Sequence, residues 1–248
     1  MKKITKLLLG GALVILLLAL PSQVKADWHQ DNIGWWYSTN NGSYYKDTLA
    51  YIDNNIYRFD ERGYMITGWY LEEHRNTNGS LYREWSYFDP VSGARLEGWQ
   101  QIDGKWYYFN SGWMAQGKQN IDGKDYYFDL VNGDMKTGWI SRQSDVKKWY
   151  YYDPESGERL LGWKDIDGKK YYLTSEGAYY GHTYTIDGKL YYFDPVTCEL
   201  ITGWFEYNGR KRYGDPNDGG ALALNKTLII DGVSYSFSDS GALITNKP

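Results

Sequence analysis

The sequence predicts an all-β protein, a solenoid of stacked β-hairpin repeats, and three observations support this. One short unit recurs along most of the chain, usually with an Asp-Gly turn inside it. Aromatic residues make up 18% of the chain, with 12 Trp and 26 Tyr, and long aliphatic runs are confined to the N-terminus. No segment after the N-terminus shows helical spacing of apolar residues over a useful length. The aromatic side chains must therefore serve both packing and recognition.

The repeat opens with a Gly-Trp pair and continues through a turn and an aromatic run. This opening position recurs every 19 to 34 residues, held by Trp35, Trp69, Trp99, Trp139, Trp163 and Trp204, and by Lys118, His182, Lys226 and Lys247 in the other units. Units of this size cannot bury a face alone, but they form a continuous core when they stack on their neighbours. The repeats fill the chain after the N-terminus, so we expect no separate catalytic domain and no catalytic residues.

The cleanest copy, residues 102–109, reads Ile-Asp-Gly-Lys-Trp-Tyr-Tyr-Phe. Asp-Gly between alternating residues is a strong hairpin signal, because both turn residues take positive φ. With Asp103-Gly104 as the turn, Trp99 pairs with Tyr108 and Gln101 pairs with Trp106. Side chains alternate along a strand, so Trp99, Trp106 and Tyr108 share one face.

Residues 1–26 are expected to be a secretory signal peptide. Lys2, Lys3 and Lys6 precede an apolar run, and a small-residue exit ends at Ala26. The domain organisation is therefore 1–26 signal peptide and 27–248 a repeat domain of about nine to ten hairpins, the last one a cap. We expect no membrane insertion once the signal peptide is removed.

Charge and cysteine content exclude several classes of protein. Removal of the signal peptide takes away four Lys and no acid, so the mature chain is more acidic than the full chain, whose net charge is −4. Nucleic-acid binders have the opposite balance, so no nucleic-acid partner is expected. The single Cys rules out a disulfide framework, and no metal site or cofactor is expected. Cys198 stands where sibling units have Gly93, Gly133 and Gly157, so its side chain is strained if the backbone there takes positive φ.

The repeats resemble the choline-binding, or cell-wall-binding, repeats of Gram-positive surface proteins. The motifs that carry the resemblance are Gly-Trp, the Gly turn, Trp-Tyr-Tyr-Phe and the opening Gly34-Trp35-Trp36-Tyr37. Related repeats of streptococcal glucan-binding proteins share the Asp-Gly-Lys and Tyr-Tyr-Phe-Asp elements. The resemblance implies a left-handed hairpin solenoid with ligand sites between neighbouring hairpins.

In that family a choline site is a cage of three aromatic side chains: the Gly-Trp indole, the Trp that opens the second strand, and the next Gly-Trp indole. Two full sets are expected, Trp69, Trp85 and Trp99, and Trp139, Trp149 and Trp163. Partial sites are expected at Trp106, Tyr108, Trp113 and Trp204. In the units of Trp163 and Trp204 we expect Tyr171 and Tyr213 in place of the second Trp, and in the unit of Trp35 we expect Ile56.

The function implied is an exported, non-enzymatic surface protein, secreted and bound noncovalently to the cell wall. Its partner would be choline or phosphocholine of wall teichoic or lipoteichoic acids, with protein partners unknown. Two alternatives remain open. One is a glucan-binding module in which aromatic faces stack on sugar rings and turn Asp residues bond hydroxyls. The other is a wall hydrolase of the autolysin type, which would need a catalytic domain beside the repeats.

Overall fold

The computed structural model describes residues 25–142 and 145–247. They fall into two compact units, one ending at Leu96 and the other starting at Glu97. The described residues form β-strands and one short 3-10 helix, η1 (Pro216–Asp218), and the predicted all-β hairpin-repeat fold is confirmed. None of the described helical structure is long and apolar enough to cross a lipid bilayer. The expected signal peptide lies outside the described residues except for Lys25 and Ala26.

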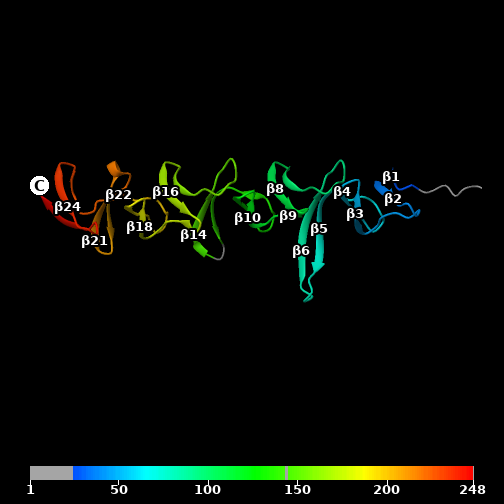
Figure 1. Ribbon diagram of the computed structural model, residues 1–248, viewed down its shortest axis with the longest axis horizontal. Helices are drawn as coiled ribbons and strands as arrows, with labels where there is room; N and C mark the ends of the chain where they lie inside the picture. The colour runs from blue at the N-terminus through cyan, green and yellow to red at the C-terminus, as the bar shows by residue number, and fades with distance from the viewer. Residues whose placement is uncertain (1–24, 143–144, 248) are drawn as a thin grey trace, which may run out of the picture. The chain divides into compact units, whose positions relative to one another are not determined.

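The first unit contains three antiparallel hairpins that follow one another along the chain (Figure 1). Its strands are β1 (Asp27–Gln30) with β2 (Trp35–Ser38), β3 (Thr48–Ile52) with β4 (Asn55–Phe59), and β5 (Gly68–Arg75) with β6 (Leu81–Phe88). The β5–β6 hairpin is the longest, and its tip projects beyond the two other hairpins of the unit (Figure 1).

The second unit contains seven hairpins in its described part, and several carry a short third strand. The hairpins are β7 (Gly98–Ile102) with β8 (Lys105–Asn110), β10 (Gly117–Ile121) with β11 (Lys124–Phe128), β13 (Gly138–Arg142) with β14 (Asp145–Tyr152), β15 (Gly162–Ile166) with β16 (Lys169–Thr174), β18 (Thr183–Ile186) with β19 (Lys189–Tyr192), β20 (Gly203–Tyr207) with β21 (Arg210–Asp215), and β23 (Thr227–Ile230) with β24 (Val233–Phe237). The third strands are β9 (Trp113–Met114), β12 (Met135–Lys136), β17 (Gly177–Ala178), β22 (Ala221–Leu222) and β25 (Leu243–Lys247).

The register of β7–β8 is the one predicted from the Asp-Gly turn. Trp99 pairs with Tyr108, and Gln101 pairs with Trp106. Asp103 and Gly104 have φ of 49° and 76°, as a two-residue hairpin turn with both φ values positive requires. We call the places of Trp99 and Trp106 in this register the first position and the second position of a hairpin.

Most hairpins bury an aromatic or aliphatic residue near the end of the second strand, whereas β2 ends in buried Ser38 and β21 in buried Asp215. The fully buried rings are Phe59, Phe88, Phe109, Phe128 and Phe193. Backbone hydrogen bonds then tie neighbouring hairpins together. The segment after one hairpin donates to the second position of the preceding hairpin: Met65 N–H to the Trp35 carbonyl over 2.7 Å, and Leu200 N–H to the Lys170 carbonyl over 2.8 Å. The strand that carries a second-position side chain is thereby held by the next repeat.

Candidate functional site

An aromatic pocket opens on the face of β7–β8 that carries both tryptophans. The Trp99 and Trp106 ring centroids are 6.4 Å apart with the rings at 84°, so the indoles form two perpendicular walls. This geometry follows from the register, since first and second positions are diagonal neighbours on one face of the hairpin.

The following two repeats supply the remaining walls. Tyr126 on β11 lies 4.8 Å from Trp99 between ring centroids, and Met135 on β12 completes the pocket together with Glu155 and Ser156. Burial raises the pKa of Tyr126, so its phenol stays neutral at physiological pH. The cavity measures about 250 Å³, which suits a small ligand.

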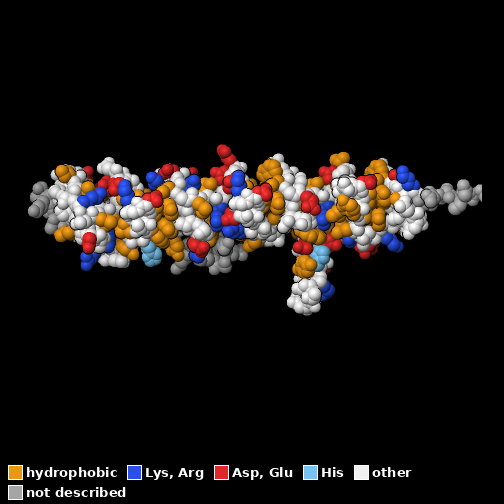
Figure 2. Space-filling model, in the orientation of Figure 1, with side chains coloured by type: hydrophobic (Ala, Val, Ile, Leu, Met, Phe, Trp, Pro, Cys, Tyr) orange, Lys and Arg blue, Asp and Glu red, His pale blue; other side chains and the backbone are white. Residues whose placement is uncertain are grey.

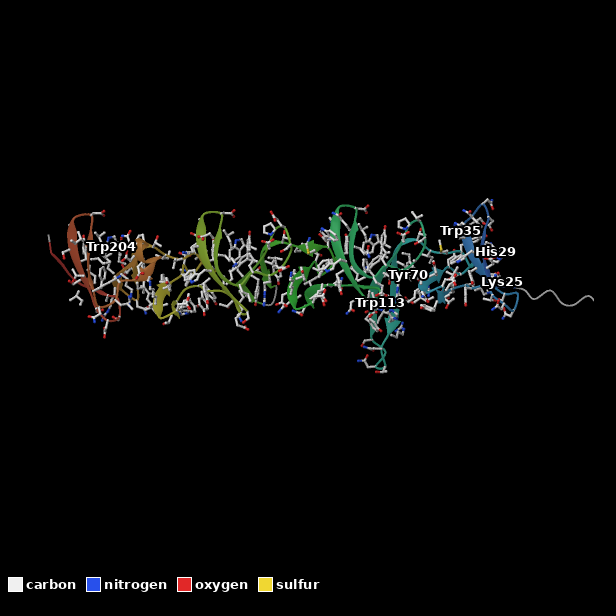
Figure 3. The ribbon with its side chains drawn as sticks, turned by 45° about the horizontal axis from the view of Figure 1, so that its top comes forward. Lys25, His29, Trp35, Tyr70, Trp113 and Trp204 are labelled. Carbon is white, nitrogen blue, oxygen red and sulfur yellow. The ribbon has the colours of Figure 1, made fainter. Side chains whose placement is uncertain are left out.

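The same pocket recurs in the first unit at equivalent register positions. Trp28 pairs with Tyr37 and Gln30 with Trp35, so Trp28 holds the first position and Trp35 the second. Their ring centroids are 6.5 Å apart at 82°. Trp35 is labelled in Figure 3, which shows it on this first hairpin.

Tyr57 on β4 lies 4.8 Å from Trp28, and Met65 follows the same hairpin. Together with Val91 and Ser92, these residues enclose about 310 Å³. We call each such set a cage. The first cage is Trp28, Trp35, Tyr57 and Met65, and the second cage is Trp99, Trp106, Tyr126 and Met135.

The methionine wall depends on a glycine in a later turn. A Cβ atom on Gly157 would lie 2.4 Å from Met135 Sδ, and one on Gly93 would lie 2.1 Å from Met65 Sδ. Both glycines have positive φ, 75° and 73°. The turn glycine therefore makes room for the thioether and also takes a backbone conformation that other residues rarely adopt.

The lengthened hairpins keep the expected tryptophans on one face. Leu71 pairs with Trp85 and Ser141 with Trp149, which is the second position in each. Trp69 and Trp85 are 6.3 Å apart at 87°, matching the second cage. The added residues extend the hairpin toward its tip and leave the register at its base unchanged.

The expected sets are placed as follows. Trp69 and Trp85 belong to the first unit, and Trp99 belongs to the second unit and its cage. Trp139 and Trp149 pack against a buried cluster that includes Tyr171, and Trp139 lies 4.8 Å from Tyr171. Trp28, Trp99 and Trp139 thus each meet a second-strand tyrosine of the next hairpin, a contact that sequence reasoning did not predict.

The pocket at Trp149 is wider than the two cages. It measures about 450 Å³ and is lined by Trp149, Tyr180, Gly181, His182, Pro195, Val196 and Cys198. Ala178, which pairs with Leu173, occupies the position that Met135 occupies in the second cage, where Met135 pairs with Phe128. A methyl group therefore replaces the methionine wall. Cys198, with φ of 63°, stands in the place of Gly157 and packs in the same buried cluster as Ala178. Burial raises the pKa of the Cys198 thiol to about 11, so the thiol stays protonated.

Two hairpins carry a lysine at the second position. Asp165 pairs with Lys170 and Glu206 with Lys211, so the expectation of Tyr171 and Tyr213 there is wrong, by one residue and by two residues respectively. Tyr213 instead pairs directly with Trp204, and Trp204 lies 4.8 Å from Tyr235 of the next hairpin. Figure 3 labels Trp204 on β20–β21.

Three other positions differ from the expected alignment. Trp35 holds a second position, not a first one, and Ile56 is the second position of β3–β4, whose first position is Leu49. Thr183 and Thr227 hold the first positions of β18–β19 and β23–β24, one residue after His182 and Lys226. In each case the number of residues between the opening dipeptide of the repeat and the hairpin turn differs from that in β7–β8, and the turn sets the register.

Of the expected partial sites, Trp106 is a wall of the second cage, and Tyr108 supports it, 5.2 Å from Trp99. Trp113 is half-buried on β9 opposite Asn110. In β10–β11 the first position is Lys118 and the second is Asp125, and their side chains form an ion pair of 2.9 Å. This hairpin has a salt bridge where its neighbour has two indoles.

The cages have the chemistry of a cation site. Ring faces carry negative quadrupole density, and a cation within about 6 Å of a ring centroid gains roughly 0.5–2 kcal/mol per contact. Glu155 adds a carboxylate at the rim of the second cage. Among the described residues, no group of three or more potential metal ligands gathers. Hydrophobic side chains reach the surface in both units (Figure 2), as open aromatic cages require.

A different pocket of about 280 Å³ lies on the opposite face of β1–β2. It is lined by Asp31, Trp36, Tyr44, Arg62 and Tyr64. The Tyr64 hydroxyl donates to Asp31 Oδ2 over 2.9 Å, and the Arg62 guanidinium lies over the Tyr64 ring at 5.6 Å. The Ile33 and Gly34 backbone N–H groups also donate to Asp31, and the pKa of its carboxyl is lowered. This pocket therefore combines three aromatic rings with one carboxylate, that of Asp31, and one guanidinium, that of Arg62.

Comparison with known proteins agrees with this geometry. The choline-binding repeat matches residues 115–161, and the cell wall binding repeat matches residues 97–112 and 162–179. The chain is 36% identical over 140 residues to a lysin of Pneumococcus phage Dp-1, covering 55% of this chain and 44% of the lysin. It is 32% identical over 94 residues to Glucosyltransferase-S of Streptococcus downei, covering 38% of this chain and 6% of that enzyme. The chain thus spans less than half the length of these relatives.

Among solved structures, the fold resembles CbpJ of Streptococcus pneumoniae, with a TM-score of 0.58 and 23% identity over 88% of this chain and 100% of that one. It also resembles choline binding protein F of the same species, with a TM-score of 0.57 and 23% identity over 90% of this chain and 99% of that one. These similarities show the shared fold. The repeat matches show that residues 97–112 and 115–179 carry repeats of the choline-binding, or cell-wall-binding, type.

Proposed function

We propose that the chain is an exported, non-enzymatic surface protein that attaches noncovalently to the cell wall by binding phosphocholine of teichoic or lipoteichoic acids. Residues 1–26 would direct export, and residues 27–248 would form the binding domain. The observation that carries the proposal is the recurrence of one cage, two perpendicular indoles with a tyrosine and a methionine, at equivalent register positions in both units.

The ligand class follows from the cage walls. A trimethylammonium group has no N–H to donate and is weakly hydrated, so ring faces and a thioether suit it better than hydrogen-bond acceptors do. The carboxylate of Glu155 and the acidic net charge of the chain favour a cation further. Open cages with few walls bind weakly one by one, and several cages on one chain give avidity for a polymer with repeated phosphocholine.

The binding side chains proposed are the tryptophan pairs at first and second positions. These are Trp28 with Trp35, Trp69 with Trp85, Trp99 with Trp106, and Trp139 with Trp149. Trp163 retains an indole at the first position and belongs to the cages that have lost their second tryptophan.

Retention on a choline-bearing column, with release by free choline, tests the proposal. Trp35→Ala and Trp106→Ala should each remove one site in a choline titration, because each takes away one wall of a cage. Trp204→Ala is the matched control, since it removes an indole from a hairpin without a tryptophan pair. A wild-type chain that passes through the column unretained would refute the proposal.

A second candidate function, binding of a glucan, is favoured by the pocket of Asp31, Trp36 and Tyr44. Aromatic rings stack on sugar faces, and the Asp31 carboxylate and Arg62 guanidinium can hydrogen-bond sugar hydroxyls. The relationship to Glucosyltransferase-S gives independent support. Retention on dextran that is lost in Trp36→Ala and kept in Trp106→Ala would establish this function. Turnover of isolated cell walls by the purified chain would instead revive the autolysin-type alternative.

A further inference from the structure

Two cages contain an ammonium group from the chain itself. On β15–β16 the Lys170 Nζ atom lies 5.5 Å from the Trp163 ring centroid, and on β20–β21 the Lys211 Nζ atom lies 4.6 Å from the Trp204 ring centroid. Both distances fall within the range of a cation–π contact. In these two hairpins the lysine stem starts from the second position, where the first and second cages have an indole.

The tyrosine wall of each cage is retained. Tyr191 lies 4.9 Å from Trp163 at 70°, and Tyr235 lies 4.8 Å from Trp204 at 71°. The equivalent pair in the second cage, Trp99 and Tyr126, is 4.8 Å apart at 71°. The tryptophan and tyrosine walls are therefore in place. Leu200, paired with Phe193, and Leu243, paired with Phe237, stand where the first and second cages have methionine.

The residue opposite each lysine has changed with it. Asp165 faces Lys170 and Glu206 faces Lys211 across the ladder. Where the second position is Trp, the opposite residue carries no charge, being Gln30, Leu71, Gln101 or Ser141. Opposite charges directly across an antiparallel pair attract, so the acid helps to hold the ammonium on the cage face.

We propose that Lys170 and Lys211 act as built-in ligands that close these two cages to choline. The side chain is tethered beside the ring, so its effective concentration there is high, and free choline must displace it to enter. Its positive charge also repels a second cation. The inference rests on the proposed choline binding, because it says which cages that function leaves unused.

Replacement of the lysine by tryptophan should open the cage. We expect Lys211→Trp and Lys170→Trp each to add about one choline site per chain in calorimetric titration, with affinity within about five-fold of the native cages. Lys169→Trp is the matched control. Lys169 immediately precedes Lys170, but its side chain points to the other face of the hairpin and pairs with Glu199. Its replacement should therefore add no site. Circular dichroism verifies that each variant folds.

An NMR measurement without choline tests the position of the lysine directly. The Cε protons of a lysine above an indole are shifted upfield by the ring current, so Lys211 should show an upfield resonance that disappears in Trp204→Leu. If the wild type binds no choline while this resonance is present, the proposed function fails and the lysine occupancy stands. If the wild type binds choline and both folded lysine-to-tryptophan variants gain no site, the inference is overturned. Absence of the upfield resonance in the wild type would also overturn it.

Discussion

The Arg159 guanidinium donates to the Asp125 carboxylate over 2.6 Å, and the Arg159 backbone N–H donates to the Asp125 carbonyl over 2.8 Å. The segment after β14 is thus bound to β11 by both backbone and side chain. Lys118 and Asn120 also contact the Asp125 carboxylate. The second position of this hairpin is a polar junction between repeats.

Asp125→Asn should destabilise the second unit. The variant leaves the largely buried Arg159 guanidinium without a charged partner, which costs about 1–3 kcal/mol. Urea denaturation measures the loss. Arg83→Gln, which breaks the exposed pair with Glu73 in the other unit, should change stability by less than about 1 kcal/mol.

The same junction predicts a dependence on pH. Burial of Asp125 acts to raise its pKa, but hydrogen bonds from Asn120 and Lys118 and the Arg159 charge outweigh it, so the pKa is lowered. A lowered folded-state pKa gives stability that is present above the unfolded value of about 3.9 and lost as the pH falls through the folded value. Melting curves between pH 6 and pH 3 should therefore fall more steeply for wild type than for Asp125→Asn. Parallel curves would rule out this contribution.

Ala178 and Cys198 should behave as a coupled pair. Ala178→Met alone should destabilise the chain by about 1–3 kcal/mol, because the thioether would meet the Cys198 side chain where the other repeats have glycine. The double variant with Cys198→Gly should recover most of this loss and narrow the Trp149 pocket. A double-mutant cycle of unfolding free energies tests the coupling, and strictly additive effects would contradict it.

Glu155→Gln should weaken choline binding at the second cage about two- to three-fold, because the carboxylate at its rim contributes a screened attraction. The difference should shrink as salt is raised in the titration. Glu61→Gln removes the same charge from an exposed position in the first unit, and we expect it to leave the second cage unchanged. A variant effect that persists undiminished at 1 M salt would argue against an electrostatic origin.

Deletion of residues 225–248, proposed as a cap, should lower stability and solubility without removing a complete cage. Trp204 packs against Tyr235 and Phe237 of this segment, so the truncation exposes an indole that is now half-buried. Thermal melting together with choline titration tests this. A truncated chain that melts unchanged and binds less choline would show that the segment is a binding unit.

Trp85→Ala and Trp149→Ala should each weaken one site by about five- to thirty-fold, the effect of about 1–2 kcal/mol lost with one cage wall. The double variant should lose most avid attachment if these hairpins are major sites. Trp204→Ala should matter far less for choline, although it costs stability through its contacts with Tyr213 and Tyr235. Abolished binding in Trp204→Ala alone would contradict this assignment.

Local chemistry was enough to predict the hairpin at Trp99, because Asp103-Gly104 sets the turn and the turn sets the register. Trp28 was missed because its hairpin turn has no Asp-Gly pair and no glycine precedes it. Lys170 and Lys211 were missed because Tyr171 and Tyr213 were expected at their positions, although both lysines lie seven residues after their first-position Trp, the spacing that separates Trp99 from Trp106. Counting forward from the turn would have found them.

The third walls of the cages were beyond sequence reasoning for another reason. Tyr57 and Tyr126 reach the preceding hairpin only through the rotation between stacked repeats, and pairing within one hairpin says nothing about that rotation. Met65 and Met135 show the same limit, since their partners Gly93 and Gly157 lie one repeat further along the chain. The sequence therefore predicts contacts within one hairpin, and it does not predict contacts between neighbouring hairpins.

Each cage takes its indoles from one hairpin and its tyrosine from the next, so its occupant is a removable cross-link between repeats. Separating β3–β4 from β1–β2 would carry Tyr57 and Met65 away from Trp28 and Trp35, and the ligand would have to leave first. At a ligand concentration one hundred times Kd, each filled site would add about 2.7 kcal/mol against that separation. A chain bound to a phosphocholine-bearing polymer would then resist unfolding, proteolysis and shear better than the free chain.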